Sequence, residues 1–255
     1  MNSGKDCIIF TIPSKYDATI LLYHFEQKND SQFMIRKVVG IYYSPIGGTA
    51  IMTERLVTQI ASMIDECSPE EVSTEYCDLY RMEKEKDASG RSFDEDTVAV
   101  IGMPCYIGKL PMPGVKLMQQ FAGSKAMTLT AVSYGGRSYG NSLYELRELA
   151  ENCGFTVVGA GAFGISYRAA RGSSRSSAPM MDTRELSAFG KAAAAKISRL
   201  GGCEVEGLRI KPAPLEVSGR MPVHKISRLS PRAAAIAEGV LARISLMRRN
   251  SEWFL

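Results

Sequence analysis

The feature that most constrains the fold of this 255-residue chain is a regular alternation of two kinds of segment. Short apolar runs suited to buried strands are followed by segments whose apolar residues recur with helical spacing. The apolar runs are Val38–Tyr43, Val98–Gly102, Met127–Ser133 and Phe155–Phe163, and Glu71–Leu79 is a weaker, more polar strand candidate. This alternation predicts an α/β fold, a three-layer sandwich with a parallel sheet between helices. Five parallel strands with a ligand loop after the first suit the spatial order 2-1-3-4-5.

The segments between these runs carry helix signals. Gly48–Glu66 has the clearest one, because its apolar residues recur at i, i+3, i+4 and i+7. Further helices are predicted over Val115–Phe121, over Asn141–Asn152 with Asn141 as N-cap, and from a capping box at Asp182 to Leu200. The charged segment Arg81–Asp96 and the serine- and arginine-rich segment Arg171–Met181 are predicted to be loops, the second of them mobile.

These signals divide the chain into three parts. Residues 37–200 form the predicted α/β domain, and residues 1–36 precede it as an extension whose pattern suits helix and strand alike. Residues 201–255 form a C-terminal extension, with a strap over Pro212–Pro231 and then a helix. We expect this helix to pack on the protein's own layers or on the second subunit of a homodimer. The alternative is that it contacts the ligand site or a partner protein. Trp253 and Phe254 are predicted to be hydrophobic anchors.

A segment of small residues joins the first predicted strand directly to the first predicted helix. It consists of Ser44, Pro45, Ile46, Gly47, Gly48 and Thr49. Free backbone N–H groups and the positive end of the helix dipole converge at such a helix start, which makes an anion site. The segment lacks the lysine of the GxxxxGK(S/T) nucleotide loop, so hydroxyls and N–H groups alone would hold a phosphate monoester, without a metal.

Two more glycine-bearing loops are predicted at the same edge of the sheet. Ligands of open parallel sheets bind beyond the carboxyl ends of the strands, which here gathers the loops after strands one, three and four. The later loops contain Pro104, Cys105, Tyr106, Ile107 and Gly108, and then Tyr134, Gly135, Arg137 and Tyr139. Aromatic side chains among glycines suit stacking on a planar heterocycle. We therefore expect Tyr106 and Tyr134 to contact a ring rather than to belong to the core.

Composition narrows the function classes. The chain is 45% apolar and 23% charged, as is ordinary for globular proteins, and no apolar run reaches the ~18 residues of a membrane span. The first apolar run, Cys7–Ile12, is shorter than the ~7 residues of the apolar part of a secretory signal, so we expect a cytoplasmic protein. We also expect no nucleic-acid partner. No two of the six cysteines form a CxxC pair and the two histidines lie far apart, which indicates neither a metal site nor an acid–base catalyst.

The motifs resemble those of the flavodoxin family. The segment Ser44–Thr49 is similar to the family's S/T-x-S/T-G-x-T phosphate loop, with Ile46 at the second hydroxyl position. Gly102–Pro111 and Tyr134–Tyr139 more narrowly resemble the flavodoxin half of flavodoxin–ferredoxin fusion proteins of anaerobic microbes. The resemblance covers roughly Val38 to Leu200, and Glu252–Leu255 is similar to the C-terminal tails of that branch.

This resemblance implies a flavodoxin-like fold that binds FMN and transfers electrons. Ser44 to Thr49 would hold the phosphate of FMN, Tyr106 and Tyr134 would flank its ring, and Arg137 and Tyr139 would line the same pocket. The chain departs from the fusion proteins in lacking a CxxCxxC module, so a ferredoxin-like partner would be a separate protein. Many flavodoxins are strongly acidic, whereas this chain has a formal net charge of +4.

Three functions are compatible with these residues. The first is an FMN-binding electron-transfer protein that works with a separate redox protein. The second is an FMN-dependent reductase of a quinone or another small acceptor, which an open face over the ring would favour. The third is a non-redox binding module that has lost its flavin.

Overall fold

A seven-stranded sheet forms the centre of the computed structural model, which describes residues 35–66, 68, 70–87, 89–135, 138–167, 179–200, 217 and 252–254. Its parallel strands are β1 (Lys37–Tyr42), β2 (Ser73–Asp78), β3 (Thr97–Cys105), β4 (Met127–Tyr134) and β5 (Thr156–Tyr167). They lie side by side in the order β2-β1-β3-β4-β5. This is the flavodoxin-like order, so the predicted fold class is confirmed.

The five predicted parallel strands are present, and the sheet has two strands that were not predicted, both short and both paired antiparallel with β5. The first, β6 (Pro179–Met181), pairs with Ile165–Tyr167, and the second, β7 (Glu252–Phe254), pairs with Ala160–Ala162. The loop predicted for 171–181 therefore ends in a strand, and its first residues, 171–178, lie outside the described residues. Trp253 and Phe254 of β7 pack against the core, as predicted for anchors.

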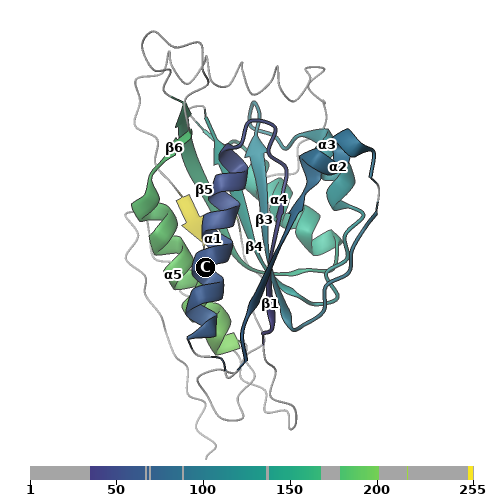
Figure 1. Cartoon of the computed structure of the whole chain (residues 1–255). Coiled ribbons are helices and arrows are strands. Elements are labelled where there is room, and N and C mark those ends of the chain that lie inside the picture. The colour runs from purple at the N-terminus through teal and green to yellow at the C-terminus, as the bar shows by residue number, and fades with distance from the viewer. Residues whose placement is uncertain are drawn as a thin grey trace, which may run out of the picture.

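Helices cover both faces of the sheet, which confirms the three-layer sandwich (Figure 1). On one face lie α1 (Gly48–Asp65) and α5 (Thr183–Leu200). On the other face lie α2 (Leu79–Glu85), α3 (Met112–Met118) and α4 (Ser142–Asn152). The N-terminal residues up to 34, the predicted strap and the predicted C-terminal helix lie outside the described residues.

Both faces of the sheet are buried, and neighbouring strand residues alternate between two cores. Val38 packs with the α1 and α5 side, whereas its neighbour Val39 packs with the α2, α3 and α4 side. Val100 and Ile101 of β3 divide in the same way. This period of two is the geometry of a pleated strand, and burial on both faces explains why the central strands are continuous apolar runs.

Helix α2 was missed by the sequence prediction, which placed a loop over Arg81–Asp96. The Asp78 carboxylate caps this short helix, because it accepts hydrogen bonds from the backbone N–H groups of Tyr80 and Arg81 at 2.9 and 3.1 Å. Arg81 also pairs with Glu85 one turn later. Capping and an i,i+4 ion pair can therefore hold a helix whose residues are mostly charged and lack a wide apolar stripe.

Two helix starts test the predicted caps. Asp182 accepts hydrogen bonds from the N–H groups of Arg184 and Glu185 at 2.9 and 3.4 Å, which confirms it as the cap of α5. Asn141 does precede α4, but its side chain makes no capping hydrogen bond. Helix α3 starts three residues earlier than predicted, immediately after Pro111.

Two glycines let α1 lie unusually close to the sheet. A Cβ atom on Gly102 of β3 would stand 1.9 Å from Thr53 Oγ1, and one on Gly40 of β1 would stand 3.1 Å from Val57 Cγ2. Thr53 and Val57 are fully buried residues of α1. Because Gly40 and Gly102 carry no side chain, α1 can approach the backbone of β1 and β3 directly. This contact fixes the start of the helix relative to the ends of the strands.

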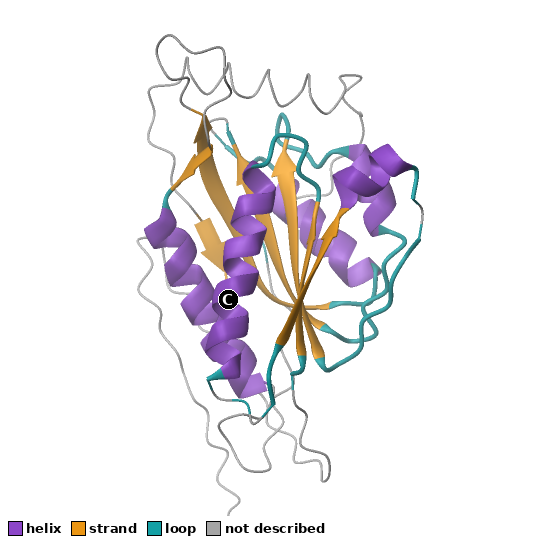
Figure 2. Ribbon diagram, viewed as in Figure 1, coloured by secondary structure: helices purple, strands orange, loops and turns teal. Residues whose placement is uncertain are grey.

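The strands β1, β3 and β4 run in the same direction and end at a common edge, from which α1 returns across the sheet (Figure 2). In the described part of the chain, no helix combines the length and hydropathy that crossing a membrane requires. That same part of the chain contains no group of three or more His, Cys, Asp and Glu side chains placed to hold a metal ion.

We predict that Gly102→Ala lowers the free energy of unfolding by about 1–3 kcal/mol, because the new methyl group overpacks the α1 contact. Urea unfolding followed by circular dichroism measures this loss. The double variant Gly102→Ala, Thr53→Ala removes the obstructing Thr53 hydroxyl and should recover part of the stability. If Gly102→Ala unfolds like the wild-type protein, α1 does not lie this close to β3.

Candidate functional site

The candidate site lies at the carboxyl edge of the sheet, where the loops after β1, β3 and β4 meet. The first loop runs from Tyr43 to Gly47 and leads into α1. The second begins at Tyr106 and the third at Gly135. A hydrogen bond from the Asn141 N–H to the Gly108 carbonyl, at 3.1 Å, joins the second loop to the third. The structure therefore brings together the three loops that the sequence predicted to be neighbours.

The start of α1 offers an anion site made of backbone. Gly47 adopts φ 86°, a left-handed conformation that glycine tolerates without strain, and it turns the chain into the helix. Among the described residues, no hydrogen-bond acceptor is found for the N–H groups of Gly48 and Thr49. An 18-residue helix thus presents unpaired donors at the positive end of its dipole, as an anionic phosphate requires.

Ser44 belongs to this anion site and also caps the helix. Its Oγ accepts a hydrogen bond from the Ala50 N–H at 2.9 Å, which leaves the hydroxyl proton available for a ligand. Pro45 is half-buried and has no N–H to donate. Ile46 exposes 40% of its surface beside these donors. The predicted phosphate loop therefore has its donors in place, and contact with a phosphate stays a prediction.

Thr49 was predicted to offer its hydroxyl to the ligand, but the structure turns this hydroxyl into the protein. Thr49 is only 3% exposed, and its Oγ1 lies 2.7 Å from Ser133 Oγ of β4. Ser133 was missed because a serine at the end of an apolar run carries no distinctive signal. The pair satisfies two buried hydroxyls and ties the first turn of α1 to β4, so Thr49 can offer the ligand its backbone N–H.

The loop after β3 is a tight turn with an unusual residue at its apex. Tyr106 and Lys109 exchange backbone hydrogen bonds of 2.8 and 3.2 Å around Ile107 and Gly108. These two central residues have φ 55° and 77°. Positive φ is ordinary for Gly108, but it strains a β-branched residue such as Ile107. Ile107 exposes 53% of its surface, so the strain holds an apolar side chain out towards solvent.

The loops after β3 and β4 lock together through glycine and a thiol. A Cβ on Gly140 would stand 2.6 Å from Gly108 Cα, so only a glycine at position 140 allows this approach. The buried Cys105 donates its thiol hydrogen bond to the Tyr139 carbonyl at 3.3 Å. Ser142 donates to the same carbonyl at 2.6 Å. The two loops therefore form one surface.

The expectation that Tyr106 and Tyr134 avoid the core is wrong. They are 7% and 4% exposed, and Tyr134 belongs to the core on the α2, α3 and α4 side. Tyr139 packs on Tyr134 with ring centroids 5.8 Å apart. Glycine-rich flanks led to the error, because they indicate a loop but not which way its aromatic side chains point. Ring contact by these tyrosines stays a prediction, and the exposed apolar side chains at this edge include Ile46 and Ile107.

The other predicted site residues lie at the same edge. Pro104 is buried within β3 and pairs in register with Ser133. Gly135 follows β4 and is half-buried. Arg137 lies outside the described residues. Pro104 therefore supports the strand end, whereas Gly135 lies where a ligand can reach its backbone.

Two acidic residues missed by the sequence analysis support these loops. Tyr43, which is buried and immediately follows β1, donates a hydrogen bond of 2.5 Å to Glu83 of α2. Burial and then this hydrogen bond raise the pKa of Tyr43, so the phenol stays protonated as a donor. Glu145 of α4 accepts a hydrogen bond of 3.0 Å from the Leu110 N–H. The sequence does carry one signal for Glu145, which is an acidic residue in the first turn of a helix that follows a glycine-rich loop.

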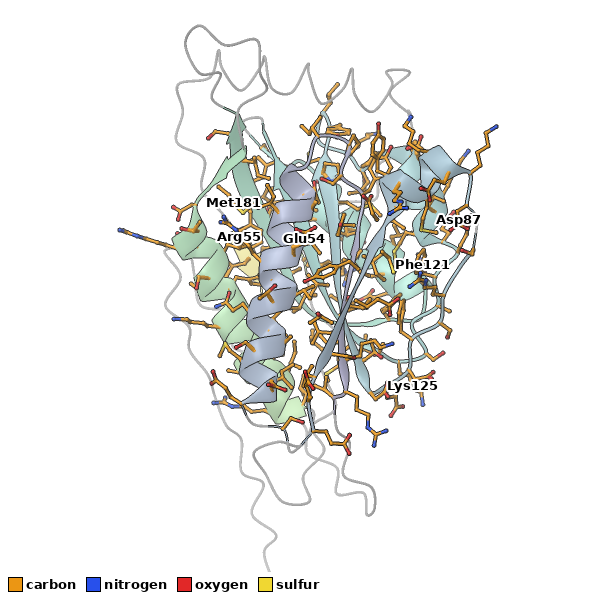
Figure 3. The ribbon with its side chains drawn as sticks, viewed as in Figure 1. Glu54, Arg55, Asp87, Phe121, Lys125 and Met181 are labelled. Atoms are coloured by element: carbon orange, nitrogen blue, oxygen red, sulfur yellow. The ribbon has the colours of Figure 1, made fainter. Side chains whose placement is uncertain are left out.

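A separate hollow of about 580 Å³ lies on the outer side of α1 and does not belong to this edge. It is lined by seven residues of α1, among them Glu54, Arg55 and Met63, and by Lys191 of α5. Figure 3 labels Glu54 and Arg55, two of the α1 residues that line this hollow. Its lining comes from the outward helix surfaces, so it offers none of the helix-start donors described above.

The chain matches no family model and no curated protein. A WrbA-like flavodoxin from Agrobacterium tumefaciens matches with 16% identity and a TM-score of 0.37, over 65% of this chain and 99% of the other. An FMN-dependent NADH-azoreductase from Bacillus anthracis in complex with FMN matches with 13% identity and a TM-score of 0.36, over 65% of this chain and 99% of the other.

A third solved structure is much longer than the matched region. The rubredoxin oxygen:oxidoreductase from the anaerobe Desulfovibrio gigas matches with 13% identity and a TM-score of 0.36, over 66% of this chain. The present chain covers 37% of that protein's length. The strand order and connections of this chain themselves define its flavodoxin-like fold.

The Thr49–Ser133 pair yields a stability prediction. Thr49→Val should lower the free energy of unfolding of the ligand-free protein by about 1–3 kcal/mol, because the Ser133 hydroxyl is left buried without a partner. Thr49→Ser keeps a hydroxyl and serves as the matched control. Adding Ser133→Ala to Thr49→Val should restore stability, which urea unfolding can measure. Wild-type stability of Thr49→Val together with weakened ligand binding would instead identify the Thr49 hydroxyl as a ligand contact.

Proposed function

We propose that this protein binds FMN at the carboxyl edge of its sheet and works as an FMN-dependent reductase of a small acceptor. The observation that carries the proposal is the start of α1, where the Gly48 and Thr49 N–H groups lack acceptors in the described structure and the Ser44 hydroxyl lies beside them. This donor set matches a phosphate monoester and needs no metal. Its position at the switch point of the sheet is the place where such folds bind their ligands.

The chain's own residues would share the binding of FMN as follows. Ser44, Gly48 and Thr49 would hold the phosphate, while the exposed Ile46 and Ile107 would offer apolar contact to the ring. The glycine-bearing turn after β3 and Gly135 would bring backbone groups to the ring edge. FMN itself supplies the one- and two-electron chemistry. No acid–base residue is required of the protein, which binds, orients and partly shields the cofactor.

Burial of the tyrosines favours a reductase over a pure electron carrier. Because Tyr106 and Tyr134 pack into the protein, their rings do not cover the solvent side of the edge. A ring face left open there could be reached by a small oxidised substrate such as a quinone. The FMN-dependent NADH-azoreductase among the matched structures has a function of this class. Electron transfer to a separate redox protein, including a ferredoxin-like one, is the alternative.

The phosphate assignment predicts that FMN binds more tightly than riboflavin, because riboflavin lacks the phosphate. Ser44→Ala should weaken FMN by about 5- to 150-fold, the loss of one hydrogen bond to a charged group, and leave riboflavin nearly unchanged. It should also destabilise the ligand-free protein by about 0.5–2 kcal/mol, because Ser44 caps α1. Flavin fluorescence quenching measures the affinities, with Ser44→Thr as control. Equal affinity of the wild-type protein for FMN and riboflavin would contradict the assignment.

The reductase assignment predicts steady-state turnover. The FMN-loaded protein should oxidise NADH or NADPH in the presence of a small quinone faster than the same concentration of free FMN does. Absorbance at the nicotinamide band follows the reaction. A protein that holds FMN but shows no turnover above free FMN with either nucleotide would support the electron-carrier alternative.

A further inference from the structure

We infer that Glu145 is the positioning residue of the turn at Tyr106–Lys109 and thereby sets how tightly the ring of the cofactor is held. The inference rests on the proposed function, since it concerns the ring side of the same site. Glu145 lies in the first turn of α4, and its Oε2 accepts the Leu110 N–H at 3.0 Å. Leu110 is the first residue after the turn, so this bond fixes the point at which the chain leaves it.

The bond differs in strength from the other links between the two loops. The Asn141 N–H bonds a neutral carbonyl at 3.1 Å, and Cys105 donates through a weak thiol at 3.3 Å. Glu145 accepts with a carboxyl oxygen, and such a bond is roughly twice as strong as a neutral one when the group is ionised. It also joins the residue after the β3 turn to α4 itself, whereas Asn141 and Tyr139 precede that helix.

The Glu145 side chain is partly buried, and the Leu110 N–H is its one hydrogen-bond partner in the described structure. Burial raises the pKa of its carboxyl group, whereas the Leu110 N–H and the charge of Lys109 act in the opposite direction. Its second oxygen, Oε1, is buried and has no hydrogen-bond partner in the described structure. The carboxyl group of Glu145 therefore depends on the Leu110 N–H for its hydrogen bond, and we infer that the turn depends on the same bond for its position.

The strain at Ile107 explains why such an anchor is needed. A β-branched residue at φ 55° persists only where the surrounding structure holds it. The Tyr106–Lys109 bonds close the turn, and the Glu145 bond holds its exit. Without that anchor Ile107 can relax, and the site then loses one of the exposed apolar side chains at this edge of the sheet. Among the described residues, no hydrogen bond joins the Glu145 side chain to residues 44–49, so phosphate binding should be unaffected.

The test compares Glu145→Ala with Glu145→Gln, which keeps an acceptor oxygen, and with Glu151→Ala as a control on the same helix. Glu145→Ala should weaken FMN and riboflavin equally, each by about 10-fold or more, so that their affinity ratio stays at the wild-type value. Glu145→Gln should recover most of this loss. Glu151→Ala should bind both flavins like the wild-type protein.

A second measurement does not depend on the flavin. Amide hydrogen exchange of Leu110 in the ligand-free protein should accelerate in Glu145→Ala, less in Glu145→Gln and not in Glu151→Ala. If Glu145→Ala is too unstable to study, Glu145→Gln still tests the anchor through the same amide, with urea unfolding as the check on its fold.

Several outcomes would overturn the inference. They are unchanged flavin affinity in Glu145→Ala, a loss for FMN but not riboflavin, a Glu145→Gln variant as weak as Glu145→Ala, and unchanged Leu110 exchange. Failure of the wild-type protein to bind either flavin would instead refute the proposed function. The Leu110 exchange would in that case still decide whether Glu145 holds the turn.

Discussion

The close approach of α1 to the sheet is the contact on which the candidate site depends. At Gly40 and Gly102 the helix meets strand backbone without intervening side chains, and Thr53 fills the space that a larger residue would need. The position of the helix sets where its first N–H groups lie relative to the ends of β3 and β4. The Thr49–Ser133 hydroxyl pair then fixes the first turn from within. The anion donors are thus held by packing and by a buried polar contact rather than by the loop alone.

Around this fixed helix start, the rest of the candidate site is made of short loops that hydrogen-bond and pack against each other. Gly108 and Gly140 permit the contact, and the strained turn at Ile107 directs an apolar side chain outwards. This combination suits a flat, partly apolar ligand with an anionic end. The donors of the anion site are backbone N–H groups and the Ser44 hydroxyl, so charged side chains of the described residues contribute little to it.

Much of the fold could be predicted from the sequence, because burial on both faces leaves mostly apolar runs at β1, β3 and β5 and a buried run of apolar and hydroxyl residues at β4. The missed elements depend on other forces. Helix α2 relies on the Asp78 cap, and β6 and β7 are three-residue strands whose pairing with β5 is long-range. For the site, the sequence located all three loops correctly. It could not reveal that Thr49, Tyr106 and Tyr134 point inwards, because side-chain direction at a loop is decided by packing.

The most direct test of this account is amide hydrogen exchange of the whole chain with and without FMN. The account predicts that added FMN protects residues 44–50 together with the loops at 105–110 and 134–141, while the outer side of α1 near Glu54 and Lys191 is unaffected. Protection confined to that outer hollow, or the absence of any protection at saturating FMN, would contradict the assignment of a flavin site to the carboxyl edge of the sheet.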